Sequence, residues 1–239
     1  MMLELGESMD VLPTEPKSLP QRIRVGDLDL LFYPNFYSEE KTAPIMQELA
    51  KLSFNTDEET SVVLGSQDEY EIVVVPRKQV AFADGDVLPY RFAGTKVGGR
   101  NWPPFLEEIR DEMNEYLIEW GIFGSGTQYA LNYCLVNYYP DGNSSLGPHR
   151  DDTRDLQDVG GETIIVSLSF GAARDFVFQK VDAPGIQYKL PLRNGDLLIM
   201  RGLTNKKWKH SVPKAKRPRA VGARYNLTFR IMKKASKKM

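Results

Sequence analysis

Two histidines and one carboxylate are the residues of this sequence best suited to bind a metal ion. The chain contains only His149 and His210, and Asp151 lies two positions after the first of them. Alternate residues of an extended segment point to the same side, so His149 and Asp151 can converge on one ion. Two imidazoles and one carboxylate on one face of a metal leave positions open for O2 and a co-substrate, as in non-haem Fe(II) oxygenases. The alternative is that His149 and Asp151 form an ordinary hydrogen-bonded pair at the surface, because so short a motif also occurs by chance.

A second candidate site lies near the carboxy terminus, where polar and apolar residues alternate at 224–231. In a strand, the polar residues share one face and the apolar residues share the other. If the polar face is buried, its two arginines need carboxylates, because an uncompensated buried charge is costly. A dicarboxylic acid such as 2-oxoglutarate would satisfy both, since arginine binds carboxylates through paired hydrogen bonds. A solvated face with exposed arginines is the alternative. The polar residues are Arg224, Asn226, Thr228 and Arg230.

The strand predicted before His149 carries further polar groups. Asn137 and Tyr139 share one face of this strand, close to where the metal would lie. They could equally cap the strand before the turn at 140–142, so their role stays open.

Short strands separated by turns dominate the sequence from residue 128 onward. Turn residues occur at 140–142, 160–161, 184–185 and 194–195. Such a pattern predicts a closed or double-sheet architecture such as a jelly roll. The expected fold class is therefore mainly β with flanking helices (α+β). The predicted strands are 129–139, 163–170, 175–179, 186–190, 196–200, 209–212 and 224–232.

The amino-terminal part is predicted to contain helices and fewer strands. Residues 1–24 contain prolines and no apolar period, which indicates a flexible arm. Ser38 suits a helix N-cap, because two acidic residues follow it in the first turn. The predicted elements are a strand at 28–33, a helix from 38 to about 52, a strand at 72–75 before a basic turn at 77–78, and a helix starting at Asn101.

Composition indicates one globular domain and favours an anionic partner. No apolar stretch is long enough to span a membrane, and the first twenty residues do not resemble a secretory signal. The single cysteine, Cys134, excludes an internal disulfide and suits a reducing compartment. Residues 201–239 contain fourteen lysines or arginines and no acidic residue, which suggests contact with a phosphate backbone. The alternative is that this basic segment is solvated and binds no partner. We expect the protein to be a monomer that resides in the nucleus, with the cytoplasm as another possible location.

Five motifs, in order and at similar spacing, make the sequence resemble the AlkB family of nucleic-acid demethylases. The resemblance covers roughly residues 76–232 and is strongest to the eukaryotic DNA-repair members. Residues 75–79 and 90–92 also resemble the family's nucleotide-recognition region. The five motifs lie at 137–139, 149–152, 169–176, 208–211 and 224–230.

The resemblance implies a single dioxygenase domain at 25–232, between the arm and a basic tail at 233–239. Its core would be a double-stranded β-helix at 128–232, with a nucleotide-recognition lid at about 60–100. His149, Asp151 and His210 would bind Fe(II), and Arg224 would pair with the distal carboxylate of 2-oxoglutarate. The rest of the co-substrate shell would be Asn137, Tyr139, Thr228 and Arg230, with Asn226 on the same strand face.

The resemblance also implies which residues would meet the substrate. Asp152, Tyr90 and Phe92 would line a pocket for an extruded base, although Phe92 could instead be core packing. Arg77 and Lys78 would contact phosphate groups. The implied reaction uses Fe(II), O2 and 2-oxoglutarate to remove methyl groups from 1-methyladenine or 3-methylcytosine in DNA, with RNA also open. Its products would be formaldehyde, succinate, CO2 and the repaired base.

Two departures from the family's pattern leave the substrate open. Thr153 stands where similar proteins have an acidic residue, which puts contact with the exocyclic amine of the base in doubt. The segment at 67–70 carries two carboxylates and only Tyr70 as a candidate wedge, so single-stranded nucleic acid is expected to be preferred. Other hypotheses are an oxygenase that acts only on RNA or on protein side chains, and a non-catalytic nucleic-acid-binding β-sandwich.

Overall fold

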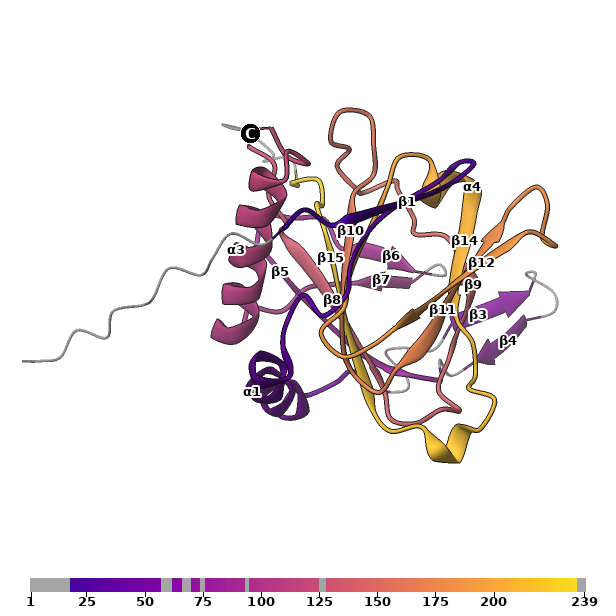
Figure 1. Cartoon of the computed structure of the whole chain (residues 1–239). Coiled ribbons are helices and arrows are strands. Elements are labelled where there is room, and N and C mark those ends of the chain that lie inside the picture. The colour runs from indigo at the N-terminus through magenta and orange to yellow at the C-terminus, as the bar shows by residue number, and fades with distance from the viewer. Residues whose placement is uncertain are drawn as a thin grey trace, which may run out of the picture.

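The computed structural model describes residues 18–56, 62–65, 70–73, 76–92, 95–124 and 128–235. Two antiparallel sheets face each other, and two helices, α1 (Glu39–Ala50) and α3 (Pro104–Glu119), lie along the outer side of the larger sheet (Figure 1). This arrangement confirms the prediction of a mainly β fold with flanking helices. No helix within the described ranges is long and apolar enough to cross a membrane.

The strand order shows how distant segments are brought together. The larger sheet has the order β1 (Gln21–Val25), β2 (Leu28–Tyr33), β13 (Leu197–Arg201), β10 (Ile165–Gly171), β15 (Arg224–Arg230), β8 (Tyr133–Tyr139) and β5 (Lys78–Ala83). The smaller sheet has the order β12 (Gln187–Leu192), β11 (Arg174–Lys180), β14 (Trp208–Val212) and β9 (Leu146–His149). Two separate hairpins are β3 (Val62–Gly65) with β4 (Tyr70–Val73), and β6 (Tyr90–Phe92) with β7 (Thr95–Val97).

Strand β15 separates two hydrophobic cores. Its apolar residues Tyr225, Leu227 and Phe229 pack in the core that the larger sheet forms with α1 and α3. Its polar residues are also buried, and they point between the two sheets, where Phe176 and Phe178 contribute to the second core. The predicted alternation is therefore confirmed, and the alternative of a solvated polar face is wrong.

The predicted helices are present, with corrected boundaries. Ser38 is the N-cap of α1, and its side chain accepts a hydrogen bond from the Lys41 amide at 3.3 Å. Helix α3 begins at Pro104 instead of Asn101, because Pro103 occupies the extended N-cap position. A proline at the first helical position costs little, since that N–H has no partner within the helix.

Three expectations about the chain need correction. The arm predicted to reach residue 24 ends earlier, because Gln21–Val25 pairs with β2 as strand β1. The sequence predicts no strand between 139 and 163, whereas the structure has β9 there, with His149 as its last residue. The basic turn expected at 77–78 instead leads into β5, an edge strand of the larger sheet, so this part of the predicted lid belongs to the sheet. Residues 1–17 of the arm and 236–239 of the predicted tail lie outside the described ranges.

Asp29 on β2 forms an ion pair with Arg22 on the neighbouring strand β1, which leads to a pH-dependent prediction. Arg22 donates two hydrogen bonds to its carboxylate, at 2.9 and 2.7 Å, and holds the pKa of Asp29 below its usual value. A lowered folded-state pKa stabilises the fold above about pH 4 and loses this effect as the pH falls through the folded-state pKa. Asp29→Asn is therefore expected to lower the free energy of unfolding at pH 7 by about 1 kcal/mol, since Arg22 is half-exposed.

Urea unfolding of the wild type and Asp29→Asn at pH 7 and pH 3 measures this difference, which should shrink at the lower pH. Asp27→Asn is the control, because Asp27 lies in the same hairpin and its one ion pair with a described residue is a long contact of 3.9 Å with Lys180. An equal loss of stability in both variants at pH 7 would contradict the role of Asp29.

Candidate active site

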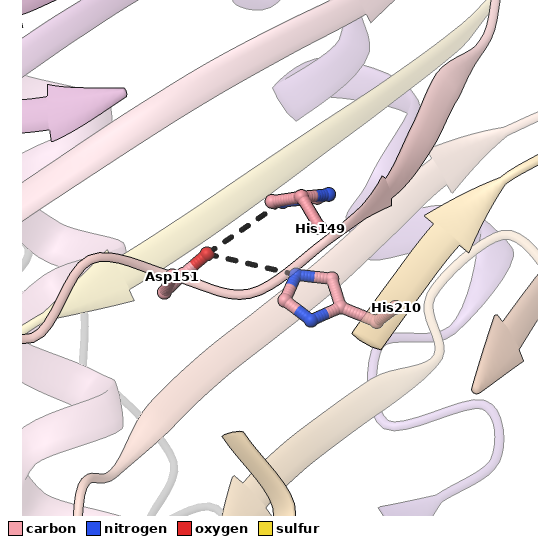
Figure 2. A group of neighbouring side chains, drawn as sticks. All are labelled: His149, Asp151 and His210. Carbon is pink, nitrogen blue, oxygen red and sulfur yellow. Dashed lines mark ion pairs between the residues drawn. The ribbon is translucent and has the colours of Figure 1, made fainter. Parts of the chain in front are cut away.

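The predicted metal ligands converge at the smaller sheet. His149 and His210 lie opposite each other on β9 and β14, and Asp151 follows two residues after β9. Asp151 Oδ1 lies 3.7 Å from His149 Nε2 and 3.6 Å from His210 Nε2 (Figure 2). Ligand atoms of all three residues lie within 4.8 Å of one another. The structure thus brings together the three residues that the sequence predicted as metal ligands.

Both histidines are uncharged, and His149 presents an unprotonated nitrogen to this point. Burial lowers the pKa of His149, and burial lowers the pKa of His210 to about 3. Both imidazoles are therefore neutral at pH 7. His149 Nδ1–H donates a hydrogen bond to the Gly147 carbonyl oxygen at 3.0 Å, which leaves Nε2 with its lone pair toward Asp151.

Asp151 has one oxygen engaged and one available. Arg230 binds Oδ2 through Nε and Nη2, both at 2.7 Å. Burial alone would raise the pKa of Asp151, but Arg230 and the two neighbouring histidines outweigh it and lower the pKa to about 2. Oδ1 is buried and has no hydrogen-bond partner in the described part of the chain. Two neutral nitrogens around an unpaired carboxylate oxygen suit a divalent cation, so the residues fit Fe(II).

Arg224 is the best candidate to bind an anionic co-substrate. Its side chain is fully buried, and burial lowers the pKa of Arg224 to about 10. Nη2 donates to Ser169 Oγ at 2.9 Å, while Nε and Nη1 find no partner among the described residues. Burying a guanidinium whose N–H groups lack hydrogen-bond partners costs folding free energy, unless an anion binds to those groups. The expectation that both arginines of β15 await an external carboxylate is therefore wrong for Arg230, which has Asp151, and stays a prediction for Arg224.

The other residues predicted for the co-substrate surround a small cavity between the sheets. The cavity has a volume of ≈ 30 Å³ and is lined by Asn137, Tyr139, Asn226, Thr228 and Arg230 together with both histidines. This is room for about one water molecule, so a dicarboxylic acid requires rearrangement of the lining side chains. The Asn226 amide is already engaged by Ser167, Leu168 and Thr228.

Arg77 does not lie where a phosphate contact requires. It was predicted in an exposed basic turn, but it is 4% exposed and lines the same cavity. Its Nε donates to Asn137 Oδ1 at 2.7 Å, and its Nη2 donates to Gln79 Oε1 at 3.3 Å. The prediction of a phosphate contact is therefore wrong for Arg77. Lys78 is exposed and remains a candidate.

The predicted base-binding residues have different surroundings. Tyr90 on β6 is buried, and its ring lies 4.3 Å from the Arg230 guanidinium, so it covers the inner cavity. Asp152 accepts hydrogen bonds from Arg154 and lines an outer groove. Phe92 ends β6, but its side chain lies outside the described residues, as does the predicted wedge segment at 67–70 apart from the Tyr70 backbone.

A wide outer groove is lined by two of the three predicted ligands. It has a volume of ≈ 970 Å³ and includes His149, Asp151 and Thr153 in its lining. Among the side chains that line this groove, cationic ones outnumber acidic ones when the predicted metal ligand Asp151 is left out. They are Arg91, Arg150, Lys206 and Lys233.

Sequence reasoning missed two further residues near the site. The Phe176 ring stacks on His210, with centroids 5.5 Å apart and planes at 15°. Arg174 donates to the carbonyls of Asp141, Ser144 and Pro213, and so joins the turns at this end of both sheets. The alternation within β11 could have identified Phe176 as inward-facing, but nothing local indicated which carbonyls Arg174 would bind.

Comparisons with known proteins agree with this geometry. A family model described as the 2OG-Fe(II) oxygenase superfamily matches residues 29–230. Human DNA oxidative demethylase ALKBH2 is 40% identical over 163 residues, which cover 65% of this chain and 56% of the human protein. Mouse alpha-ketoglutarate-dependent dioxygenase alkB homolog 3 is 31% identical over 209 residues, which cover 84% of this chain and 65% of the mouse protein.

The chain thus spans a little over half the length of the human relative, and slightly less than two thirds of the mouse one. The solved structure of OsALKBH1 superimposes with a TM-score of 0.58 at 20% sequence identity, covering 88% of this chain and 100% of that one. This likeness confirms the predicted jelly-roll fold.

Proposed function

The chain belongs to the 2OG-Fe(II) oxygenase superfamily, and from this premise we propose that it oxidatively demethylates N-alkylated bases in DNA, such as 1-methyladenine and 3-methylcytosine. The observation that carries the proposal is the convergence of both histidines on the unpaired Oδ1 of Asp151, beside a basic groove that His149 and Asp151 line. The relatives named as DNA oxidative demethylases support the substrate class.

Different residues of the site would bind the metal and the co-substrate. His149, Asp151 and His210 would hold Fe(II), while Arg230 fixes the second oxygen of Asp151. Arg224 would pair with the distal carboxylate of 2-oxoglutarate, because its Nε and Nη1 lack partners in the described structure. The chemistry that bound Fe(II) supplies is oxidation of the methyl C–H bond by O2, coupled to decarboxylation of 2-oxoglutarate to succinate and CO2.

The outer groove suits a nucleotide. Its cationic side chains Arg150, Lys206 and Lys233 offer contacts to a phosphate backbone. A methylated Watson–Crick edge pairs poorly, so such a base leaves its stack at lower cost than an intact one. The hydroxylated methyl group would then leave as formaldehyde, which restores the N–H of the base.

Residence in the nucleus is part of the proposal. Imaging of a tagged chain tests it, and exclusion of that chain from nuclei would oppose it.

We expect formaldehyde and the repaired base from a single-stranded oligonucleotide with one 1-methyladenine, in the presence of Fe(II), ascorbate and 2-oxoglutarate. The same oligonucleotide without the methyl group is the control and should release no formaldehyde. A matched duplex is expected to react more slowly, and equal or faster turnover of the duplex would contradict the preference for single strands. Succinate formation without repair of any methylated DNA or RNA would overturn the proposed substrate class and point to protein side chains.

A further inference from the structure

Asp151 differs from the two histidines in how its backbone is held. His149 and His210 lie in paired strands, whereas Asp151 lies in the segment after β9 that has no regular structure. It is nevertheless 4% exposed, so its main-chain N–H and C=O groups need partners inside the protein. The sheet hydrogen bonds that fix the histidines are therefore not what fixes this ligand.

Both main-chain groups of Asp151 are bound by one side chain. The Asp151 N–H donates to Asn205 Oδ1 at 2.9 Å, and Asn205 Nδ2 donates to the Asp151 carbonyl at 3.0 Å. Asn205 is itself 5% exposed. It lies on α4 (Thr204–Lys207), the short helix between β13 and β14, five residues before His210. The Lys206 carbonyl on the same helix accepts a hydrogen bond from Arg150 at 3.0 Å.

Helix α4 is in turn anchored to the larger sheet. Thr204 Oγ1 accepts a hydrogen bond from the Asp29 N–H at 2.8 Å and donates to the Asp29 carbonyl at 2.9 Å. Thr204 is 1% exposed, so water does not compete with these bonds. Hydrogen bonds therefore fix Thr204 to β2, and the next residue in the chain, Asn205, is hydrogen-bonded to the backbone of the metal ligand.

We propose that Asn205 is a positioning residue for Asp151, and that Thr204 fixes Asn205 in place. Arg230 holds Oδ2 of the carboxylate and Asn205 holds the backbone, so Oδ1 keeps its direction toward the two histidine Nε2 atoms. A ligand held in this way before the metal arrives binds more tightly than one that must be ordered on binding. The inference rests on the metal site of the proposed function.

The test measures metal affinity without nucleic acid, so its outcome is independent of the substrate class. Co(II) is the probe, and its absorption spectrum also reports the ligand geometry. Asn205→Ala is expected to raise the Kd for Co(II) about 10-fold to 100-fold, as loss of a partner behind a metal ligand typically does, and to change the Co(II) spectrum. Wild-type affinity and spectrum in Asn205→Ala would overturn the proposal.

Asn132→Ala is a closely matched control. Asn132 is 6% exposed and makes the same pair of bonds to another backbone, donating to the Met232 carbonyl at 2.9 Å and accepting from the Met232 N–H at 2.7 Å. Both alanine variants should lower Tm, but only Asn205→Ala should weaken Co(II) binding. Equal weakening in both would show a general loss of stability and overturn the proposal.

A second pair of variants decides the question if Asn205→Ala does not fold. Thr204→Ser keeps the hydroxyl that binds the Asp29 backbone, whereas Thr204→Val replaces it at similar volume. Thr204→Val is expected to raise the Kd for Co(II), and Thr204→Ser to retain the wild-type value. The same Kd in both variants would overturn the proposal that the Thr204–Asn205 segment positions Asp151.

Discussion

His210→Ala is expected to weaken metal binding by more than about 100-fold and to abolish succinate formation. His210 supplies one of only three ligand atoms that converge in the described structure, and it is 6% exposed. Loss of a group behind a metal ligand typically costs about 10-fold to 100-fold in affinity, and loss of the ligand itself exceeds that range. Titration with Co(II) and quantification of succinate measure the two effects separately.

Ser211→Ala is the control for this experiment. Ser211 is the next residue of β14, is also buried, and donates to the Val177 carbonyl at 3.3 Å, away from the metal ligands. It should keep the wild-type metal affinity. Retained Co(II) binding in His210→Ala would contradict the assignment of the metal site, whatever happens to the activity.

The parts of this site that could be predicted from sequence are those with a local period. Alternation along 224–231 predicted that Arg224 and Arg230 would share a face, because side chains of a strand point to opposite sides in turn. The same rule joined His149 to Asp151. His210 could be added since it is the only other histidine, which is a property of composition and not of spacing.

Hydrogen bonds and ion pairs between residues that are far apart in the sequence could not be predicted in this way. Arg77 follows an apolar segment and precedes Lys78, so it resembled part of an exposed basic turn. Its burial results from β5 pairing with β8, which places it beside Asn137. Likewise, the bond between Arg230 and Asp151 joins residues 79 positions apart. The acceptor that pairs with a buried cation depends on how the sheets pack in the folded protein, so the local sequence does not predict it.

Asn205 shows the same limit for uncharged groups. An asparagine after a strand end is typical of a turn, and turns hold many such residues for local reasons. Its function depends on Asp151, a residue 54 positions away whose backbone lacks a strand partner. That requirement becomes visible only when the hydrogen-bond partners of Asp151 are traced in the structure.

Arg224→Met is expected to raise the KM for 2-oxoglutarate on the order of 100-fold without lowering Tm in the absence of co-substrate. Removing one partner of a buried ion pair costs about 3 kcal/mol or more, which corresponds to that change in KM. Before the co-substrate binds, however, Nε and Nη1 of Arg224 are buried without described partners. An apolar side chain of similar length removes this penalty, so the Tm of the co-substrate-free protein should stay the same or rise.

Arg174→Met separates this effect from general damage to the arginine-rich end of the sheets. Both guanidiniums lie near the Tyr139 ring, at 5.3 Å for Arg224 and 5.8 Å for Arg174, and both side chains are buried. Arg174, however, is engaged by three backbone carbonyls. Its replacement should lower Tm, because those carbonyls lose their donor, and should leave the KM for 2-oxoglutarate nearly unchanged. An equal rise in KM for both variants would mean that Arg224 acts through the local structure and not by binding the co-substrate.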